Sequence, residues 1–97
     1  MQLRDMEAFL AVCRSGSLVA AVGHYPLTVS ALSKAIRRVE REVGVDLFDR
    51  RGSRLSLNHS GRKFAVRAEM IVALFREAKS LACEEQKRAS RLAHESS

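Results

Sequence analysis

A stripe of polar side chains recurs at helical spacing in the segment that follows Pro26. Residues three and four apart share one face of a helix, so these side chains would lie in a row. Hydroxyl groups can hydrogen bond to base edges, and ammonium and guanidinium groups neutralise phosphates. The stripe therefore has the chemistry to recognise a nucleic acid, although a basic face can also serve solubility alone. Its members are Ser30, Ser33, Lys34, Arg37 and Arg41.

A second group of cations lies around Gly52, where a hairpin turn is expected. Arg50, Arg51 and Arg54 crowd this turn. The chain of 97 residues has a net charge of +6, and residues 34–63 hold nine basic against four acidic side chains, a net of +5. A concentration of this kind suits a surface that faces a polyanion, while a hairpin tip that is merely soluble stays an alternative.

Other kinds of chemistry find little support in the sequence. His24, His59 and His94 share no spacing with either cysteine, so we expect no metal site. Neither a Ser/His/Asp set nor a pair of carboxylates nor a glycine loop for phosphate is visible, so we expect no enzyme and no cofactor.

The cysteine and hydropathy patterns indicate a cytoplasmic protein. Cys13 and Cys83 stand alone, as free thiols in a reducing cytosol do. No apolar stretch of about 20 residues is present, and charges interrupt the N-terminus, so neither a membrane span nor a signal peptide is expected.

Three short helices would position the polar stripe. Apolar spacing predicts them over residues 3–14, 18–24 and 29–43. Ser17 and Thr28 are expected to cap the second and third helices, and Pro26 separates the two. Gly16 and Gly44 stand where the first and third helices should end.

A hairpin and a long helix follow. We expect strands over residues 47–50 and 54–57, then a helix capped by Asn58 or Ser60 that runs to about residue 90. A domain of this size cannot cover so long a helix, so an apolar a/d seam along it predicts a homodimer. The first two turns of the seam could instead pack on the domain itself. The seam comprises Phe64, Ala68, Ile71, Phe75, Ala78 and Ala82, widened by Leu74 and Leu81.

These elements make a mainly α fold: a winged helix-turn-helix of three helices and a two-stranded β-hairpin wing, followed by a long linker helix. We expect a DNA-binding domain over residues 1–58, a linker and dimerisation helix over 59–90, and a frayed tail over 91–97. The break at Pro26 would let the helix over 28–43 project into the major groove. The expected DNA contacts are Ser17, Thr28, Val29, Ser30, Ser33 and Lys34, with Arg37 and Arg41 on the backbone. The wing residues Arg50, Arg51 and Arg54 are expected on the backbone or in the minor groove.

The ordered motifs along the chain resemble the DNA-binding domain of LysR-type transcriptional regulators. They are Gly16-Ser17, Ala20-Ala21, Thr28-Val29-Ser30-Ala31-Leu32-Ser33, Ile36-Arg37-Arg38-Val39-Glu40, Gly44, Leu47-Phe48-Asp49-Arg50 and Leu57-Asn58 before Gly61. The resemblance covers about residues 1–88. It implies a bacterial regulator that binds partly palindromic promoter DNA as a dimer, or as a tetramer in a full-length form. It also implies a small-molecule effector only if a further C-terminal domain exists.

One departure from the family bears on base preference. Val29 stands where the family usually has glutamine, and a valine can contact a thymine methyl but cannot pair with adenine. The alternative to a DNA reader is a protein-interaction module that pairs with a full-length regulator through the long helix and binds DNA weakly. An enzyme is the remote third class.

Overall fold

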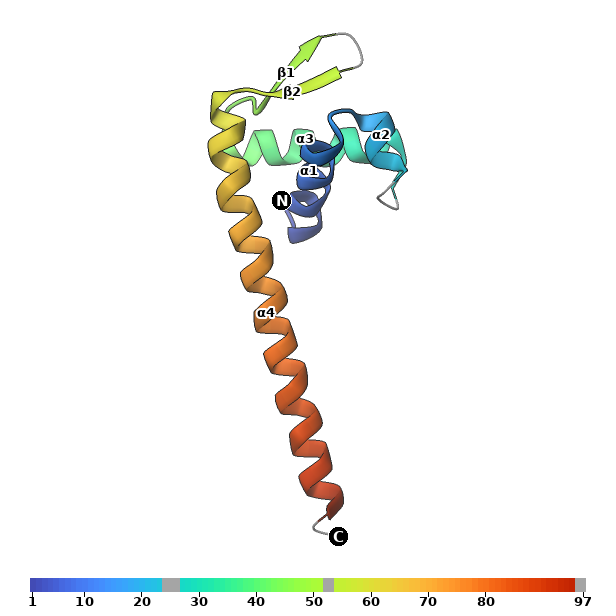
Figure 1. Cartoon of the computed structure of the whole chain (residues 1–97), viewed down its shortest axis with the longest axis vertical. Helices are drawn as coiled ribbons and strands as arrows, with labels where there is room; N and C mark the ends of the chain where they lie inside the picture. The colour runs from blue at the N-terminus through green and yellow to red at the C-terminus, as the bar shows by residue number, and fades with distance from the viewer. Residues whose placement is uncertain (24–26, 52–53, 96–97) are drawn as a thin grey trace.

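The computed structural model describes residues 1–23, 27–51 and 54–95. Helices α1 (Leu3–Ser15), α2 (Leu18–Val22) and α3 (Val29–Val43) are followed by strands β1 (Phe48–Arg51) and β2 (Arg54–Leu57), and helix α4 (His59–Glu95) ends the chain. Figure 1 shows the first three helices and the hairpin as a body from which α4 extends far to one side. We use "body" below for residues 1–58.

The residues predicted to cap the short helices do so in the structure. The Ser17 hydroxyl accepts from the Ala20 N–H at 3.0 Å, and the Thr28 hydroxyl accepts from the Ala31 N–H at 3.1 Å. Gly16 and Gly44 end α1 and α3 with φ of 76° and 94°, a left-handed conformation that glycine adopts without steric cost. Helix α2 ends at Val22, two residues before the predicted end, and His24, Tyr25 and Pro26 lie outside the described residues.

The core forms between α1, α3 and the start of α4. Phe9 lies at its centre, fully buried, and its ring meets Phe48 and Phe64 edge to face with centroids 5.4 and 5.3 Å apart. Leu32, Ile36 and Val39 bury the inner face of α3. Because this face is fixed, the opposite face of α3 must point to solvent.

The hairpin is antiparallel, with Phe48 opposite Leu57 and Arg51 opposite Arg54. Leu55 is buried and Ser56 exposed, as the alternation predicts. Strand β1 begins at Phe48 rather than at Leu47, because the Leu47 backbone bonds outside the ladder. Its N–H donates to the Glu40 carboxylate at 2.7 Å, and its carbonyl accepts from the Asn58 N–H at 3.0 Å.

Asn58 caps α4 and ties it to the hairpin. Its side-chain oxygen accepts from the Gly61 N–H at 2.7 Å, and its side-chain nitrogen donates to the Asp46 carbonyl at 2.8 Å. Helix α4 then continues to Glu95, five residues beyond the predicted end near residue 90. All the described side chains from Glu77 to Ala93 are exposed, so beyond Arg76 the helix stands clear of the body.

Candidate nucleic-acid interface

The first turns of α3 protrude from the body, as the sequence predicts. Thr28, Ser30 and Lys34 are exposed, Val29 is 42% exposed, and Ser33 is half-buried. Arg37 and Arg41 are exposed farther along the same stripe. The structure thus brings all the predicted residues of α3 onto one solvent-facing surface, which we call the α3 face.

The N-terminus of α3 has its cap in place. The Thr28 hydroxyl uses one acceptor lone pair toward the Ala31 N–H, so its O–H can still donate to DNA and one lone pair can still accept. The Ser17 hydroxyl is engaged in the same way at α2. Both residues therefore cap a helix and keep a hydroxyl O–H that can donate to DNA.

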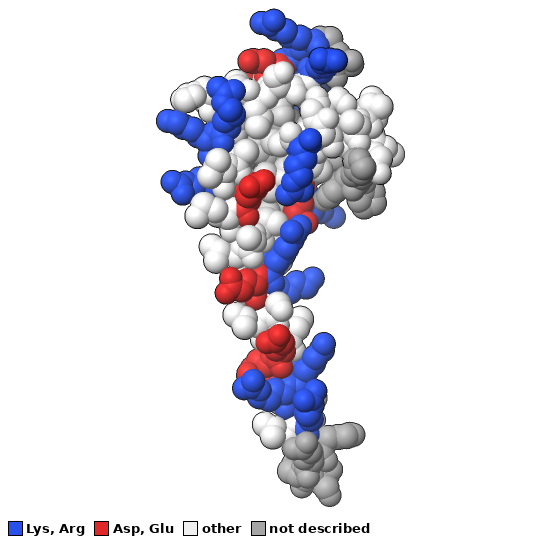
Figure 2. Space-filling view, in the orientation of Figure 1, with Lys and Arg blue, Asp and Glu red and all other residues white. Residues whose placement is uncertain are grey.

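The wing lies against the start of the helix-turn-helix. Arg54 forms a β-bridge with Ser17, and the Leu55 N–H donates to the Gly16 carbonyl at 3.5 Å. Backbone pairing therefore sets the position of the wing relative to α2. Figure 2 shows Lys and Arg side chains gathered on the wing, whereas α4 carries both signs of charge along its length.

Two wing arginines share one face of the hairpin. Arg51 and Arg54 are direct cross-strand partners, which places their side chains next to each other. Like charges in this position repel each other, and an anion placed between them would relieve the repulsion. Both side chains are exposed.

Arg50 has a different environment from its two neighbours. Its guanidinium donates to Glu40 at 3.2 Å, and the Glu40 carboxylate is largely buried beneath it. A phosphate that approached Arg50 would have to share it with Glu40. The predicted trio of wing arginines is thus divided into an exposed pair and a residue that links the wing to α3.

An ion pair fixes α3 against α1. Arg38 donates to the buried carboxylate of Asp5, with 2.9 Å between the guanidinium nitrogen and the oxygen. The hydrogen bond from Arg38 is the main reason why the pKa of Asp5 lies below its ordinary value. Arg38 therefore holds α3 in place and does not belong to the α3 face.

The predicted dimerisation seam divides into two parts. Phe64 is half-buried and packs on Phe9, and Ala68 is fully buried, so the start of the seam lies against the body, which was the alternative left open for its first two turns. Ile71, Leu74, Phe75 and Leu81 are 47–64% exposed, and Ala78 and Ala82 are exposed as well. A long apolar stripe remains on α4 that none of the described residues covers.

Two residues of structural importance were missed in the sequence. Glu40 follows Ile36 by four positions, a spacing that places it at the edge of the buried face of α3, where a carboxylate needs partners. Val72 is buried against the body and follows Ala68 by four positions. Together with Ala65, these spacings of three and four mark an inner face of α4 that shares only Ala68 with the predicted seam.

Comparisons with known proteins agree with this geometry. Residues 3–62, more than half of the chain, match the family described as bacterial regulatory helix-turn-helix protein, lysR family. The chain belongs to the lysR family. The resemblance seen in the sequence is confirmed.

Individual relatives of the lysR family extend this finding. The HTH-type transcriptional regulator YeiE of Escherichia coli K12 is 44% identical over 66 residues, which are 68% of this chain and 22% of YeiE. YybE of Bacillus subtilis is 34% identical over 79 residues, which are 81% of this chain and 27% of YybE. The chain therefore spans about a quarter of the length of these two regulators.

Solved structures share the whole architecture. DarR of Vibrio fischeri, solved in complex with DNA, superposes with a TM-score of 0.83 at 25% identity, over 90% of this chain and 30% of DarR. The DNA complex of the CbnR DNA-binding domain superposes with a TM-score of 0.82 at 22% identity, over 88% of this chain and 98% of that one. The predicted winged helix-turn-helix with its long final helix is confirmed. Within the residues that the structure describes, no helix is long and apolar enough to cross a membrane.

Proposed function

We propose that this chain is the sequence-specific DNA-binding and dimerisation part of a bacterial LysR-type regulator, and that it acts in the cytoplasm without catalysing a reaction. The observation that carries the proposal is the α3 face, whose polar and cationic residues stay exposed while Leu32, Ile36 and Val39 bury the opposite side. A helix about 10–12 Å across fits the major groove of B-DNA, which is about 12 Å wide.

The residues of the α3 face take two roles. Ser30, Ser33 and Lys34 lie within the first turns, where they reach base edges, and Val29 offers a methyl contact to thymine. Arg37 and Arg41 lie one and two turns farther along, where phosphates come within reach. The exposed pair of Arg51 and Arg54 binds backbone phosphates or enters the neighbouring minor groove.

A homodimer supplies two such surfaces. The stripe from Ile71 to Leu81 is exposed in the single chain, and pairing it with a second copy would remove it from water. Two linked bodies require two half-sites, so the DNA target of the dimer is partly palindromic.

Salt dependence of binding tests the assignment of phosphate contacts. Arg37→Ala and Arg54→Ala should each weaken binding to every duplex and lower the slope of log K against log salt by about one. Arg91→Ala removes the same charge from the exposed far end of α4 and should leave the slope unchanged. An unchanged slope for both test variants would remove these arginines from the interface.

Base preference separates direct readout from general affinity. Lys34→Ala and Ser33→Ala should lower the ratio of specific to random binding, because they remove donors near base edges. An equal loss on specific and random duplexes would contradict direct readout. A chain that dimerises but shows no salt-sensitive affinity for any duplex would instead be the protein-interaction module.

A further inference from the structure

A hollow lies between α1, α2 and the part of α4 that touches the body, away from the α3 face. Its volume is about 540 Å³, and its floor contains Leu10, Ala11 and Val72. Arg14 and Arg76 stand at its polar rim together with Glu7. Sites for small molecules typically have this size, with an apolar lining and a few charged groups.

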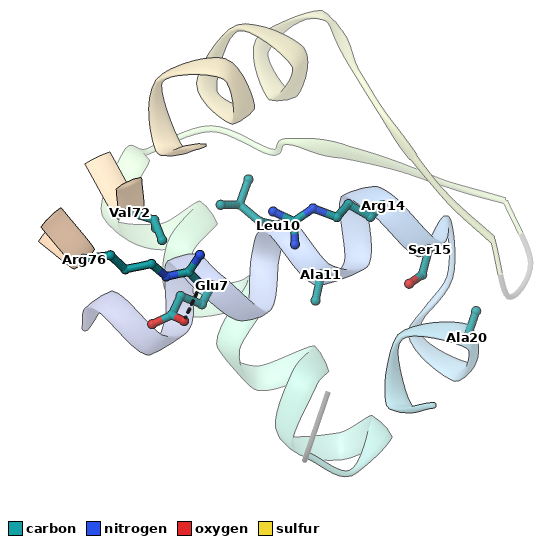
Figure 3. A pocket seen from close by; sticks show the side chains of 8 residues that line it. All are labelled: Glu7, Leu10, Ala11, Arg14, Ser15, Ala20, Val72 and Arg76. Atoms are coloured by element: carbon teal, nitrogen blue, oxygen red, sulfur yellow. Dashed lines mark hydrogen bonds and ion pairs between the residues drawn. The ribbon is translucent and has the colours of Figure 1, made fainter. Parts of the chain in front are cut away.

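The two guanidiniums converge on this floor. Figure 3 shows the side chains of Arg14 and Arg76 extending toward each other over Leu10 from opposite ends of the hollow. Arg76 donates to Glu7 at 3.2 Å, whereas the structure assigns Arg14 no ion pair among the residues that it describes. Two arginines and one glutamate leave a local charge of +1, which matches one anionic group.

A second copy that pairs through the apolar stripe of α4 would leave this hollow open. Each residue advances about 100° around a helix, so Leu74 and Leu81 point some 140–160° away from Arg76. The apolar stripe used for dimerisation is therefore on the other side of α4 from the hollow. The occupant of the hollow must therefore be a molecule other than a second copy of the chain.

We propose that this hollow binds a small organic anion with one carboxylate and an apolar body. The carboxylate accepts from Arg14 and Arg76, and the apolar body covers Leu10, Ala11 and Val72. Glu7 competes with the ligand for Arg76. This site is separate from the α3 face; only the exclusion of a second copy as its occupant rests on the dimer proposed above.

The hollow lies where a bound ligand would affect the contact between α4 and the body. Arg76 pairs with Glu7 of α1, and all the described side chains that follow it, from Glu77 to Ala93, are exposed. A ligand that withdraws Arg76 from Glu7 removes one contact between α4 and α1. Loss of this contact would change the angle between the two bodies of a dimer.

Titration with defined probes, followed by amide chemical shifts of the full chain without DNA, tests the site. We expect 3-phenylpropionate to bind saturably with a Kd on the order of millimolar, as suits a half-open site and a ligand of this size, and to shift amides of α1, α2 and α4 around the hollow. Acetate lacks the apolar body and 3-phenylpropionamide lacks the charge, so both should bind several-fold more weakly.

Matched variants keep the proposal falsifiable. Arg14→Gln should weaken binding about threefold, as expected for an exposed ion pair, and Arg91→Gln should leave it unchanged. Glu7→Gln should strengthen binding because it frees Arg76. Absence of saturable shifts up to about 20 mM, or equal shifts with acetate, would overturn the proposal.

Discussion

Substitution of Gly61 by alanine tests how closely α4 and the hairpin are packed. Gly61 lies in the first turn of α4 and has a helical conformation, so alanine would normally favour the helix by about 0.8–1 kcal/mol. A Cβ atom at this position would, however, collide with the Leu47 carbonyl oxygen, and it would lie 2.8 Å from the Leu57 Cδ2 atom. That carbonyl is fixed because it accepts from the Asn58 N–H at 3.0 Å.

The collision therefore has to be relieved by moving backbone. Overpacking of this kind costs about 1–3 kcal/mol, and an immobile backbone atom places the cost at the upper end. After the gain in helix propensity, we expect Gly61→Ala to lower the free energy of unfolding by about 2 kcal/mol, or the Tm by about 10 °C at equal protein concentration.

Gly23→Ala is the matched control. Gly23 has a φ of −66°, and an added Cβ would lie 3.4 Å from the Ala20 carbonyl oxygen, an ordinary contact. Urea unfolding followed by circular dichroism should place this control within about 0.5 kcal/mol of the parent. If Gly61→Ala were as stable as Gly23→Ala, the close approach of α4 to Leu47 would be refuted.

Three further predictions concern acid stability, thiol reactivity and assembly. Because the pKa of Asp5 is below its ordinary value of 3.8, its ion pair stabilises the fold above about pH 4 and is lost as the pH falls through the lowered pKa. Urea midpoints should drop less between pH 7 and pH 3 for Asp5→Asn than for the parent, and equal drops would contradict the role of the ion pair. Burial raises the pKa of the Cys13 thiol to about 12, so iodoacetamide at pH 8 should label Cys83 before Cys13. Equal labelling of the two cysteines, measured by mass spectrometry, would argue against the burial of Cys13. Leu74→Lys should shift sedimentation toward the monomer, while Val45→Lys, at an apolar residue of the body that is also more than half exposed, should not.

Local signals in the sequence predicted most of the fold. Serine, threonine and glycine at helix ends, together with apolar spacing, located α1, α2 and α3 to within two residues. These features depend on neighbours in sequence, which is why one chain was enough to find them. The spacing of Leu32, Ile36 and Val39 identified the buried side of α3, and the exposed side could be predicted as the opposite one.

Contacts between distant segments could not be predicted in this way. The role of Gly61 depends on the Leu47 carbonyl, and that of Arg50 on Glu40, ten residues away in a different element. Ala68 satisfied the heptad pattern equally well as a core or a dimer residue, because both kinds of burial require the same spacing. The end of α4 was misplaced because the last residues carry neither a proline nor a glycine stop.

Selection of bound duplexes from random DNA tests the central claim most directly. With the purified chain, we expect enrichment of a partly palindromic sequence with two half-sites. The same selection with Lys34→Ala should yield a changed preference at one position in each half-site, because the lost donor lies in the first turns of α3. Enrichment of no sequence by the parent chain, or of an identical sequence by the variant, would contradict the account of α3 as the element that reads DNA.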